Sequence, residues 1–519
     1  MKIFSSGQIQ EADKFTIANE GVSSIDLMER AASAFTNEFI RHFRPHLPVI
    51  VFCGPGNNGG DGLAICRLLK GHGYEVFAAI LQITDNYSVD FRINLGRLQE
   101  MKEVPILYIT EISDTPVIPE NAVVIDAVFG MGLSRALNGL PSEIVKRLNK
   151  LQAVRVAVDM PSGLFADKAN AEEDPIFKAD YTYSFQLPKL AFMMPANEQF
   201  VGKWKILDIG LSREFIQKTE SRYHYLMMDD VLPIVKERPQ FSYKNMYGHT
   251  LIMAGSYGKI GAAVLTTKAC LRTGVGLVTA YLPKCGYSIM QSAVPEAMVI
   301  TDEHEQFLSD IPALSAFSVV GVGPGLGKSK ETRTALLQLF RNRDEPLVID
   351  ADALNILAEN KEYFGDLPKN SVLTPHPGEF SRLAGKADND FEQINMLSDL
   401  SKKYNCIMLL KTSATAIALP DGTLWFNSTG NPGMATGGTG DVLTGVITGL
   451  ISQRYEPAEA ALLGVYLHGL AGNIAASRSG YESLTAGDVI HSLGKAWKAL
   501  HKQKRMRKIK YRDTEDTNY

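Results

Sequence analysis

Residues 431–451 read NPGMATGGTGDVLTGVITGLI, and this stretch predicts the fold of the second half of the chain. Four glycines precede Asp441, and an apolar run follows it at once. Such a pattern predicts a loop that opens a helix and presents backbone N–H groups to an anion, with the helix dipole behind them. A carboxylate facing the same anion is costly unless it takes a proton from an attacking hydroxyl. The stretch therefore favours phosphoryl transfer over passive phosphate binding, although an Asp that only stabilises the helix start is the alternative.

Outward from this stretch, short runs rich in Val, Ile and Leu alternate with helical segments along the whole chain. Runs bounded by Gly, Pro or Asp are typical of strands covered on both faces. The runs are LPVIVFCG, YEVFAAIL, AVVIDAVFG and VRVAVDMPSG in the first half, and HTLIMAGS, LVTAYLP, FSVVGVG, PLVIDADAL, SVLTPHPGEF and NCIMLLKTSATAIAL in the second. Because 519 residues exceed one ordinary core, we expect an α/β protein of two doubly wound three-layer αβα domains. Their expected bounds are 1–222 and 223–500, with a disordered tail at 501–519.

Composition excludes several classes of function. The formal net charge of −4 gives no support to binding of nucleic acid or a membrane surface. The five cysteines are scattered without a C-x-x-C pair, which argues for reduced thiols in the cytoplasm and against a zinc site. The N-terminus lacks the apolar region of a secretory signal, and no apolar run approaches the roughly 20 residues of a membrane span. We therefore expect a cytoplasmic enzyme with small-molecule partners.

Three strand ends of the first half carry polar loops. Gly54-x-Gly56-x-x-Gly59 follows the first strand, but the next strand, YEVFAAIL, lacks the acidic end of a dinucleotide-binding unit. Asp126 and Asp159 end two further strands. A single Asp in such a place is often a helix cap. Three polar loops at the carboxyl ends of parallel strands instead predict one pocket.

These residues also carry a resemblance. GPGNNGGDGLAICRLL, DAVFGMGLSRAL and AVDMPSGL resemble the motifs of the NAD(P)H-hydrate epimerase family over about residues 1–215. The resemblance implies a potassium ion held by Asn58, Asp126 and Ser162, and hard oxygen donors suit such an ion. It also implies substrate contacts from Asn57, Asn58, Gly59, Gly60, Asp61, Gly130, Met131, Gly132, Leu133, Ser134, Arg135, Ala136 and Asp159.

Epimerisation acts on a carbon that bears a hydroxyl beside the ring nitrogen. The nitrogen lone pair can expel the hydroxyl, and water can return on either face, so one group must shuttle a proton. We expect that group to be Asp159. Lys189 of SFQLPKLAF is the second candidate, and a solvated lysine is its alternative interpretation.

The second half resembles the ribokinase-like superfamily, whose signature ends in Gly-x-Gly-Asp with the Asp as base. Its NAD(P)H-hydrate dehydratase branch matches over about residues 225–500 in blocks such as VIDADALN, TPHPGEFSRL, LLKTSATAI and NSTGNPGMATGGTGDVLTGVI. The two halves together resemble the bifunctional NAD(P)H-hydrate repair enzymes. The implied fold is a Rossmann-like N-terminal domain joined to a ribokinase-like C-terminal domain, and the implied assembly is a homo-oligomer.

The implied dehydration consumes ADP. The 6-hydroxyl of the (S)-hydrate attacks the terminal phosphate, AMP leaves, and the phosphate ester eliminates to restore NADH or NADPH, with Asp441 as the base and Mg²⁺ at the phosphates. The resemblance assigns substrate contacts to Gly261, Gly323, His376, Pro377, Gly378, Glu379 and Asp441. It assigns ADP contacts to Lys411, Thr412, Ser413, Ala414, Thr415, Asn431, Gly437, Gly438, Thr439 and Gly440. Thr412 departs from the glycine that the family often has after this lysine.

Some assignments stay open at this point. Gly261 can be a close-packing glycine instead. Asp350 and Asp352 can orient a Mg²⁺ hydrate or cap the following helix. We expect His249 and His468 to be structural.

Two other functions compete with repair. One is a small-molecule kinase, for hydroxymethylpyrimidine or a sugar, fused to a nucleotide-binding module. The other is a non-catalytic binding protein. The product formed from hydrated NADH and ADP separates them, and the sequence does not choose between NADHX and NADPHX as substrate.

Overall fold

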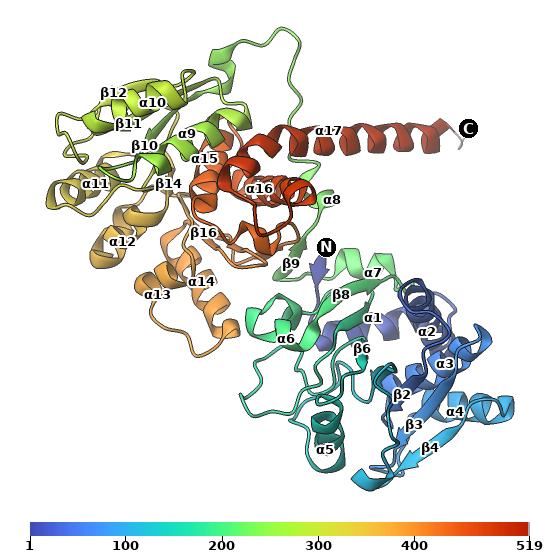
Figure 1. The fold of residues 1–519 in the computed structure, drawn as a ribbon. Coiled ribbons are helices and arrows are strands. Elements are labelled where there is room, and N and C mark those ends of the chain that lie inside the picture. Colours follow the sequence, from blue (N-terminus) through green and yellow to red (C-terminus); the bar gives the residue numbers. More distant parts are fainter. Residues whose placement is uncertain (517–519) are drawn as a thin grey trace. The chain divides into compact units, whose positions relative to one another are not determined.

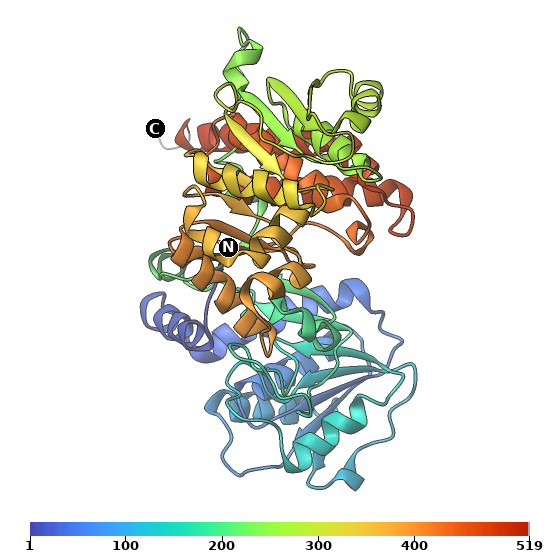
Figure 2. The ribbon, with the colours of Figure 1, turned by 90° about the vertical axis from the view of Figure 1, so that its left-hand side faces the viewer.

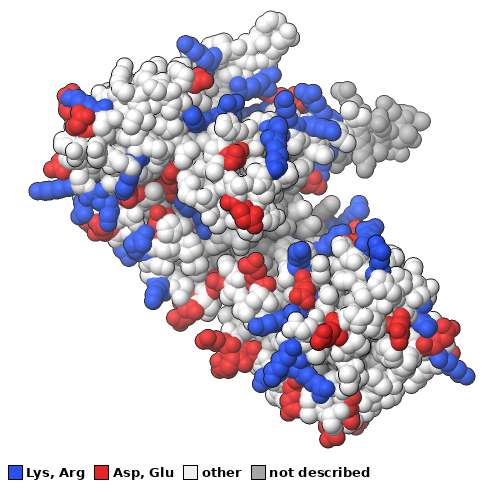
Figure 3. All heavy atoms as spheres, in the orientation of Figure 1, with Lys and Arg blue, Asp and Glu red and all other residues white. Residues whose placement is uncertain are grey.

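The computed structural model describes residues 1–516 and divides the chain between Ser221 and Arg222 into two compact units (Figure 1). We refer to Lys2–Ser221 as the N-terminal unit and to the residues from Arg222 as the C-terminal unit. Each unit has a mostly parallel sheet with helices on both faces, so the predicted α/β class is confirmed. Figure 2 shows the same ribbon from a second side. Basic and acidic side chains are mixed on the faces that Figure 3 shows, in keeping with the net charge of −4.

The sheet of the N-terminal unit has the strand order β4-β3-β2-β5-β6-β7-β8, and every neighbouring pair is parallel. Its strands are β2 (Val49–Cys53), β3 (Val76–Leu81), β4 (Ile106–Ile109), β5 (Val123–Ala127), β6 (Val154–Val158), β7 (Tyr181–Phe185) and β8 (Lys203–Leu207). All four strands predicted for this half are present.

Two hydrophobic cores cover the two faces of this sheet. Alternate residues of β2 point to opposite sides, because Val49 and Val51 join one core while Ile50 and Phe52 join the other. The first core packs against α2 (Ser24–His42), α3 (Asn57–Gly71) and α4 (Val89–Met101), and the second against α5 (Gly139–Leu148). The remaining elements of the unit are β1 (Lys2–Ile3), α1 (Ser6–Asn19), α6 (Glu198–Val201) and α7 (Arg213–Lys218).

Within the C-terminal unit the strand order is β9-β18-β17-β16-β15-β14-β13-β10-β11-β12. The strands are β9 (Tyr223–Leu226), β10 (His249–Met253), β11 (Leu277–Leu282), β12 (Met298–Thr301), β13 (Val319–Val322), β14 (Leu347–Ile349), β15 (Val372–Leu373), β16 (Ile407–Leu410), β17 (Ala416–Ala418) and β18 (Leu424–Asn427). β17 pairs antiparallel with both β16 and β18. Only five residues join β16 to β17, too few for the crossover that a parallel pair needs.

The helices of this unit form the outer layers of its sheet. They are α8 (Met228–Val231), α9 (Ile260–Thr273), α10 (Tyr287–Ala293), α11 (Lys330–Asn342), α12 (Ala351–Glu359), α13 (Pro377–Ala384), α14 (Asp390–Tyr404), α15 (Thr439–Ser452), α16 (Pro457–Ser479) and α17 (Ala486–Asp516). A large core joins α15, α16 and α17 to β14, β15 and β16. Among the described residues, α16 is long and apolar enough to cross a membrane, but 67% of its apolar window is buried within the protein, as in a core helix.

The expected disorder from residue 501 differs from the structure. Residues 501–516 continue α17, and residues 517–519 lie outside the described part of the chain. The side chains of Trp497 and Leu500 anchor the preceding turns of the helix in the core, which the charged composition of the tail does not reveal.

Candidate active sites

The N-terminal unit has its switch point between β2 and β5. The chain leaves β2 towards β3 on one side and returns as β5 on the other, so a crevice opens at the carboxyl ends of these two strands. The loops that follow them approach closely there, because a Cβ on Gly54 would lie 2.0 Å from the carbonyl oxygen of Val128. A Cβ on Gly59 would lie 1.8 Å from the carbonyl oxygen of Gly54. These glycines therefore serve close packing of the loop, which explains the resemblance to a dinucleotide fingerprint.

A cavity of about 530 Å³ lies in this crevice, a size usual for small-molecule sites. Of the predicted substrate contacts, Asn57, Asn58, Asp61, residues 130–135 and Asp159 line it, whereas Gly59, Gly60 and Ala136 do not. The lining also includes residues that the sequence did not single out, and these are Ile9, Gln10, Asp13, Gly56, Val128, Phe129, Phe185, Gln186, Ile209 and Leu211.

The predicted potassium ligands converge behind the loop 128–130. Ser162 donates from its hydroxyl to Asp126 Oδ1 at 2.6 Å and from its backbone N–H to Oδ2 at 2.7 Å. The N–H of Phe129 donates to Ser162 Oγ at 2.8 Å. Burial raises the pKa of Asp126 to about 6 despite the bonds from Ser162 and Val128.

Asn58 completes this group. A Cβ on Gly130 would lie 3.3 Å from the Asn58 Oδ1, so the amide adjoins the same loop. The buried Nδ2 of Asn58 has no hydrogen-bond partner, and exchanging the amide oxygen and nitrogen would turn the oxygen to that position. An orphaned buried amide next to the loop 128–130, which Ser162 and Asp126 also contact, fits a hard cation such as potassium.

Asp159 is held by a network that the sequence did not predict. Its Oδ1 accepts hydrogen bonds from Lys189 Nζ at 2.7 Å, from Phe185 N at 2.9 Å and from Ser184 Oγ at 3.1 Å. Lys189 is 1% exposed and also donates to two backbone carbonyls. The interpretation of Lys189 as a solvated lysine is therefore wrong. Asp159 has φ = 62°, an uncommon conformation for a non-glycine residue that is concentrated at functional sites.

In the C-terminal unit, the glycine loop opens α15 as predicted. The helix begins at Thr439, and Asp441 is its third residue. Gly438 precedes it at φ = 90°, which favours glycine. Burial and then the carboxylates of Asp350, Asp352 and Glu379 raise the pKa of Asp441 to about 6, while Lys411 opposes them.

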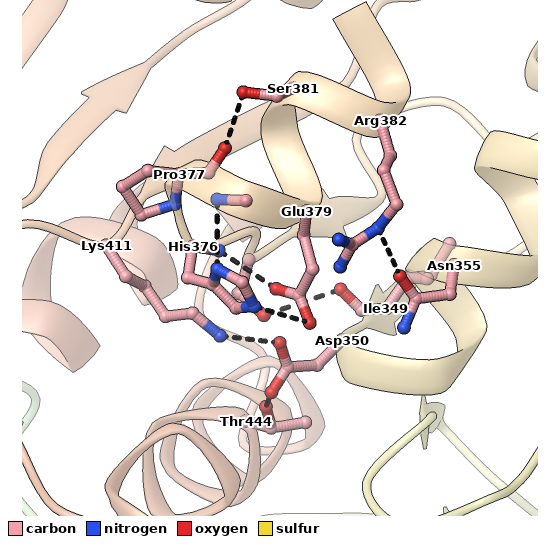
Figure 4. Close-up of polar contacts among 12 residues, drawn as sticks. Ile349, Asp350, Asn355, His376, Pro377, Glu379, Ser381, Arg382, Lys411 and Thr444 are labelled. Carbon is pink, nitrogen blue, oxygen red and sulfur yellow. Dashed lines mark hydrogen bonds and ion pairs between the residues drawn. The ribbon is translucent and has the colours of Figure 1, made fainter.

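Asp350 lies between Lys411 and Thr444 of α15, as Figure 4 shows. Lys411 Nζ donates to Asp350 Oδ1 at 2.7 Å, and Thr444 Oγ1 donates to Oδ2 at 2.7 Å. Asp350 takes the N-cap position of α12, but its side chain makes no capping hydrogen bond. Of the two roles left open for Asp350, the helix cap is therefore wrong. A Cβ on Gly440 would lie 3.3 Å from Lys411 Nζ, so this predicted ADP contact adjoins the glycine loop.

A second cavity, of about 430 Å³, lies beside Asp441. It is lined by Gly258, Lys259, Gly261, Ala262, Gly325, Ala351, Asp352, Asn355, Glu379 and Asp441. A Cβ on Gly261 would meet nothing within 4 Å, so Gly261 is no close-packing glycine and faces open space. Gly323 is absent from this lining, and a Cβ there would lie 1.8 Å from the Asp350 carbonyl oxygen.

The PHPGE block forms a helix start with one residue in the cavity. His376 is the N-cap of α13. Its ring Nδ1 accepts a hydrogen bond from the backbone N–H of Gly378 at 3.0 Å, and its backbone N–H donates to Glu379 Oε2 at 2.9 Å. Glu379 lines the cavity, whereas His376, Pro377 and Gly378 do not. The capping box therefore accounts for the histidine and also orients the glutamate that faces the cavity.

Asp352 orders the loop that follows β13. It accepts from Gly327 N at 2.9 Å and pairs with Lys259 Nζ at 3.3 Å. Its carboxylate therefore faces the cavity beside Gly325 rather than acting as a cap of α12. Within the described residues, no three His, Cys, Asp or Glu side chains are close enough to hold a metal alone.

The other predicted ADP contacts lie outside the cavity lining. Thr412 to Thr415 form the turn between β16 and β17, closed by a bond from Thr415 Oγ1 to the Thr412 carbonyl at 3.2 Å. Asn431 bonds Asn473 of α16 at 3.0 Å. His468 is buried in α16, where burial lowers its pKa to about 4. His249 bonds Thr279 at 2.8 Å, and the structural roles expected for the two histidines stay predictions.

Comparison with known proteins assigns both units. The family described as NAD(P)H-hydrate dehydratase matches residues 250–495, and the family described as YjeF-related protein N-terminus matches residues 24–191. The bifunctional NAD(P)H-hydrate repair enzyme Nnr of Moorella thermoacetica is 34% identical over 95% of this chain and 96% of its own length. The enzyme of the same name from Escherichia coli is 32% identical over 91% and 89%. A solved ADP/ATP-dependent NAD(P)H-hydrate dehydratase from Bacillus subtilis, co-crystallised with ATP and Mg²⁺, covers 53% of this chain and 98% of its own at 28% identity and a TM-score of 0.48.

Proposed function

We propose that this chain, which belongs to the family of bifunctional NAD(P)H-hydrate repair enzymes, performs both repair steps on hydrated NADH and NADPH. The N-terminal unit interconverts the (R)- and (S)-hydrates. The C-terminal unit dehydrates the (S) form to NADH or NADPH while ADP becomes AMP and phosphate. The observation that carries this proposal is Asp441 in the first turn of α15, beside a cavity and above the Lys411–Asp350 pair.

Asp441 is the base of the dehydration. A base works best when its pKa lies near the working pH, and burial with neighbouring carboxylates brings the pKa of Asp441 to about 6. It takes the proton of the 6-hydroxyl, whose oxygen then bonds to the terminal phosphorus of ADP as AMP departs. Phosphate leaves carbon far more readily than hydroxide does, so the ester eliminates and the reduced nicotinamide ring is restored.

The residues around Asp441 provide the charge balance for this transfer. The N–H groups of Gly437 to Gly440 at the start of α15 face the transferring phosphoryl group, where a helix N-terminus stabilises negative charge. Lys411 lies beside Gly440 and adds a positive charge. Mg²⁺, when bound, neutralises the phosphates, and Asp352 and Glu379 line the cavity where carboxylates can orient its water shell.

The epimerisation uses the N-terminal cavity. Asn57, Asp61 and the loop 130–135 line the place for the hydrated nucleotide, and Asp159 faces it from the end of β6. Asn58, Asp126 and Ser162 are the potassium ligands of this proposal. A potassium ion held by them would supply a fixed positive charge in this cavity, and Ser162 accepts a hydrogen bond from Phe129 of the loop 128–130.

One experiment tests both activities. The full-length protein is mixed with an epimer mixture of hydrated NADH, ADP, Mg²⁺ and K⁺, and the absorbance of restored NADH is followed with ATP in a parallel arm. We expect complete restoration with ADP. Asp441→Asn should abolish restoration of NADH and leave the exchange of epimers, measured by chromatography, unchanged. With Asp159→Asn, the NADH formed should equal only the (S)-hydrate present at the start.

Other outcomes choose the competing functions. A stable phosphorylated product from another alcohol, with no NADH restored, would identify a small-molecule kinase. Absence of any turnover, unchanged by Asp441→Asn, would identify a binding protein. The expected homo-oligomer and the cytoplasmic location remain predictions, which light scattering and cell fractionation can test.

A further inference from the structure

One turn of α1 contributes a wall to the N-terminal cavity. Ile9, Gln10 and Asp13 line it, and Ile9 and Asp13 lie four residues apart on one face of the helix. Asp13 precedes the residues that match the family of the N-terminal unit, which begin at 24. Among the described residues, none donates a hydrogen bond to the Asp13 carboxylate. An acidic side chain left without partners and directed into a cavity is free to exchange a proton with a ligand.

Asp159 lines the same cavity, but its carboxylate accepts several hydrogen bonds. Three donors converge on its Oδ1, including the buried ammonium of Lys189 at 2.7 Å. A proton placed on that oxygen would displace these bonds, which is costly because they are made to a charged group. The Oδ1 of Asp159 is therefore occupied by three donors, whereas no donor engages the Asp13 carboxylate among the described residues.

The charged groups that face Asp13 come from three elements. Asp159 at the end of β6 repels its negative charge and Lys189 attracts it, while Asp61 of α3 lines the same cavity. Burial and Asp159 raise the pKa of Asp13 to about 6. Burial raises the pKa of Asp61 well above its ordinary value, with additions from Asp159, Asp13 and Asp90. Asp13 therefore combines a raised pKa with a carboxylate that accepts no hydrogen bond from the described residues.

We propose that Asp13 is the acid–base residue of the epimerisation, an inference that rests on the proposed epimerase function. Asp13 in its acid form gives its proton to the hydroxyl oxygen on the reacting carbon. The carbon–oxygen bond breaks with its electron pair on oxygen, water departs, and the ring-nitrogen lone pair forms a carbon–nitrogen double bond. Water then adds to either face of that carbon and returns a proton to the Asp13 carboxylate.

The neighbouring groups divide the remaining work. The intermediate carries a positive charge on the ring, and the Asp159 carboxylate, held in place by Lys189, stabilises it through the field of a fixed anion. Asp61 lines the same cavity and can form a hydrogen bond with the substrate. Asp159 and Lys189 are thus positioned for electrostatic stabilisation, and Asp13 carries the proton.

The test uses the full-length protein, the hydrate mixture and excess ADP, Mg²⁺ and K⁺. NADH should be restored in a fast phase equal to the (S) share and a slow phase set by epimerisation of the (R) form. For Asp13→Asn we expect an unchanged fast phase and a slow phase at least about 100-fold slower, the usual contribution of general acid–base catalysis. The matched control is Glu11→Gln, which removes an exposed carboxylate from the same helix and should leave both phases unchanged.

The pH profile separates a proton carrier from a structural residue. With the rate without enzyme subtracted, the wild-type slow phase should fall about tenfold from pH 7 to pH 8, as the acid form of a group with a pKa near 6 is depleted. Residual activity of Asp13→Asn should lose this fall, and Asp13→Glu should keep it with at least a tenth of the rate. Melting curves check folding, and if Asp13→Asn does not fold, Asp13→Glu and the wild-type profile decide.

Three results would overturn the proposal. They are a slow phase in folded Asp13→Asn within threefold of wild type, an unchanged pH profile in its residual activity, and an inactive Asp13→Glu that folds. Failure of the proposed function looks different, because the wild type itself would then show no slow phase above the rate without enzyme. Loss of the slow phase in Asp159→Asn but not in Asp13→Asn would refute the Asp13 role alone.

Discussion

Replacing Lys411 with methionine isolates the electrostatic support beneath Asp441. Methionine keeps an unbranched side chain and removes the ammonium that lies 2.7 Å from Asp350 Oδ1. The side chain of Asp350 is 2% exposed and that of Lys411 is 20% exposed, so the change leaves a buried carboxylate without its counter-ion.

The cost follows from this geometry. Removing one partner of a buried pair costs about 3–5 kcal/mol. Thr444 still donates to Asp350 and the lysine is partly exposed, so we expect the lower end, about 3 kcal/mol of unfolding free energy for the C-terminal unit. At about 1.4 kcal/mol per factor of ten, this raises the unfolded population about 150-fold.

Urea denaturation measures this loss unit by unit. The chain has three tryptophans, and Trp425 and Trp497 belong to the C-terminal unit. In a Trp204→Phe background, tryptophan fluorescence therefore reports that unit alone. The double variant Lys411→Met/Asp350→Asn removes both charges and should recover all but about 1 kcal/mol, because no unpaired charge remains.

Two outcomes would refute the reasoning. A loss below about 0.5 kcal/mol in Lys411→Met would mean that water or a rearranged donor replaces the ammonium at no cost. A double variant no more stable than Lys411→Met would mean that the cost arises from packing of the lysine stem rather than from the carboxylate left behind.

Further predictions concern activity. The kcat/KM for dehydration should fall about tenfold from pH 7 to pH 5, because Asp441, with a pKa near 6, must be ionised to act as the base. Asp352→Asn removes a charge that raises this pKa, so the fall should move to lower pH. If titration of ADP caused the fall, the variant would leave it in place. Ser162→Ala should abolish the stimulation of epimerisation by K⁺, measured as the rate in a series of different cations, and should leave dehydration unchanged. Equal stimulation in the variant and the wild type would exclude this potassium site. Gly438→Ala should slow dehydration at least tenfold, since its Cβ would lie 2.5 Å from a leucine carbon of α9 and its φ is 90°. The control is Gly437→Ala, whose Cβ would meet nothing within 4 Å, and similar losses in both would assign the effect to the loop as a whole.

Local patterns in the sequence determined the fold class and the two site locations. Apolar runs of four to eight residues predicted ten strand regions, and each corresponds to a strand of the structure. The loops after the strands predicted the pockets, because the carboxyl ends of parallel strands share one edge of a sheet. The glycine pattern before Asp441 predicted the start of α15, because helix starts depend on neighbouring residues alone.

The tertiary structure decided what each side chain of these motifs does. Gly59 and Gly323 proved to be packed against backbone, whereas Gly261 faces a cavity. No sequence pattern distinguishes a glycine that allows another backbone segment to approach from one that leaves room for a ligand. Lys189 is buried against Asp159, although lysines in such contexts are usually solvated.

Asp13 shows the same limit most clearly. It lies on a helix with no motif of its own, and only the folding of α1 over the ends of β2, β5 and β6 directs its carboxylate into the cavity. Sequence alone determined which strand ends carry chemistry, because that depends on local order along the chain. The protonation and partners of the carboxylates depend on burial and on charges far away in sequence, so only the tertiary structure could decide which of them holds a charge and which moves a proton.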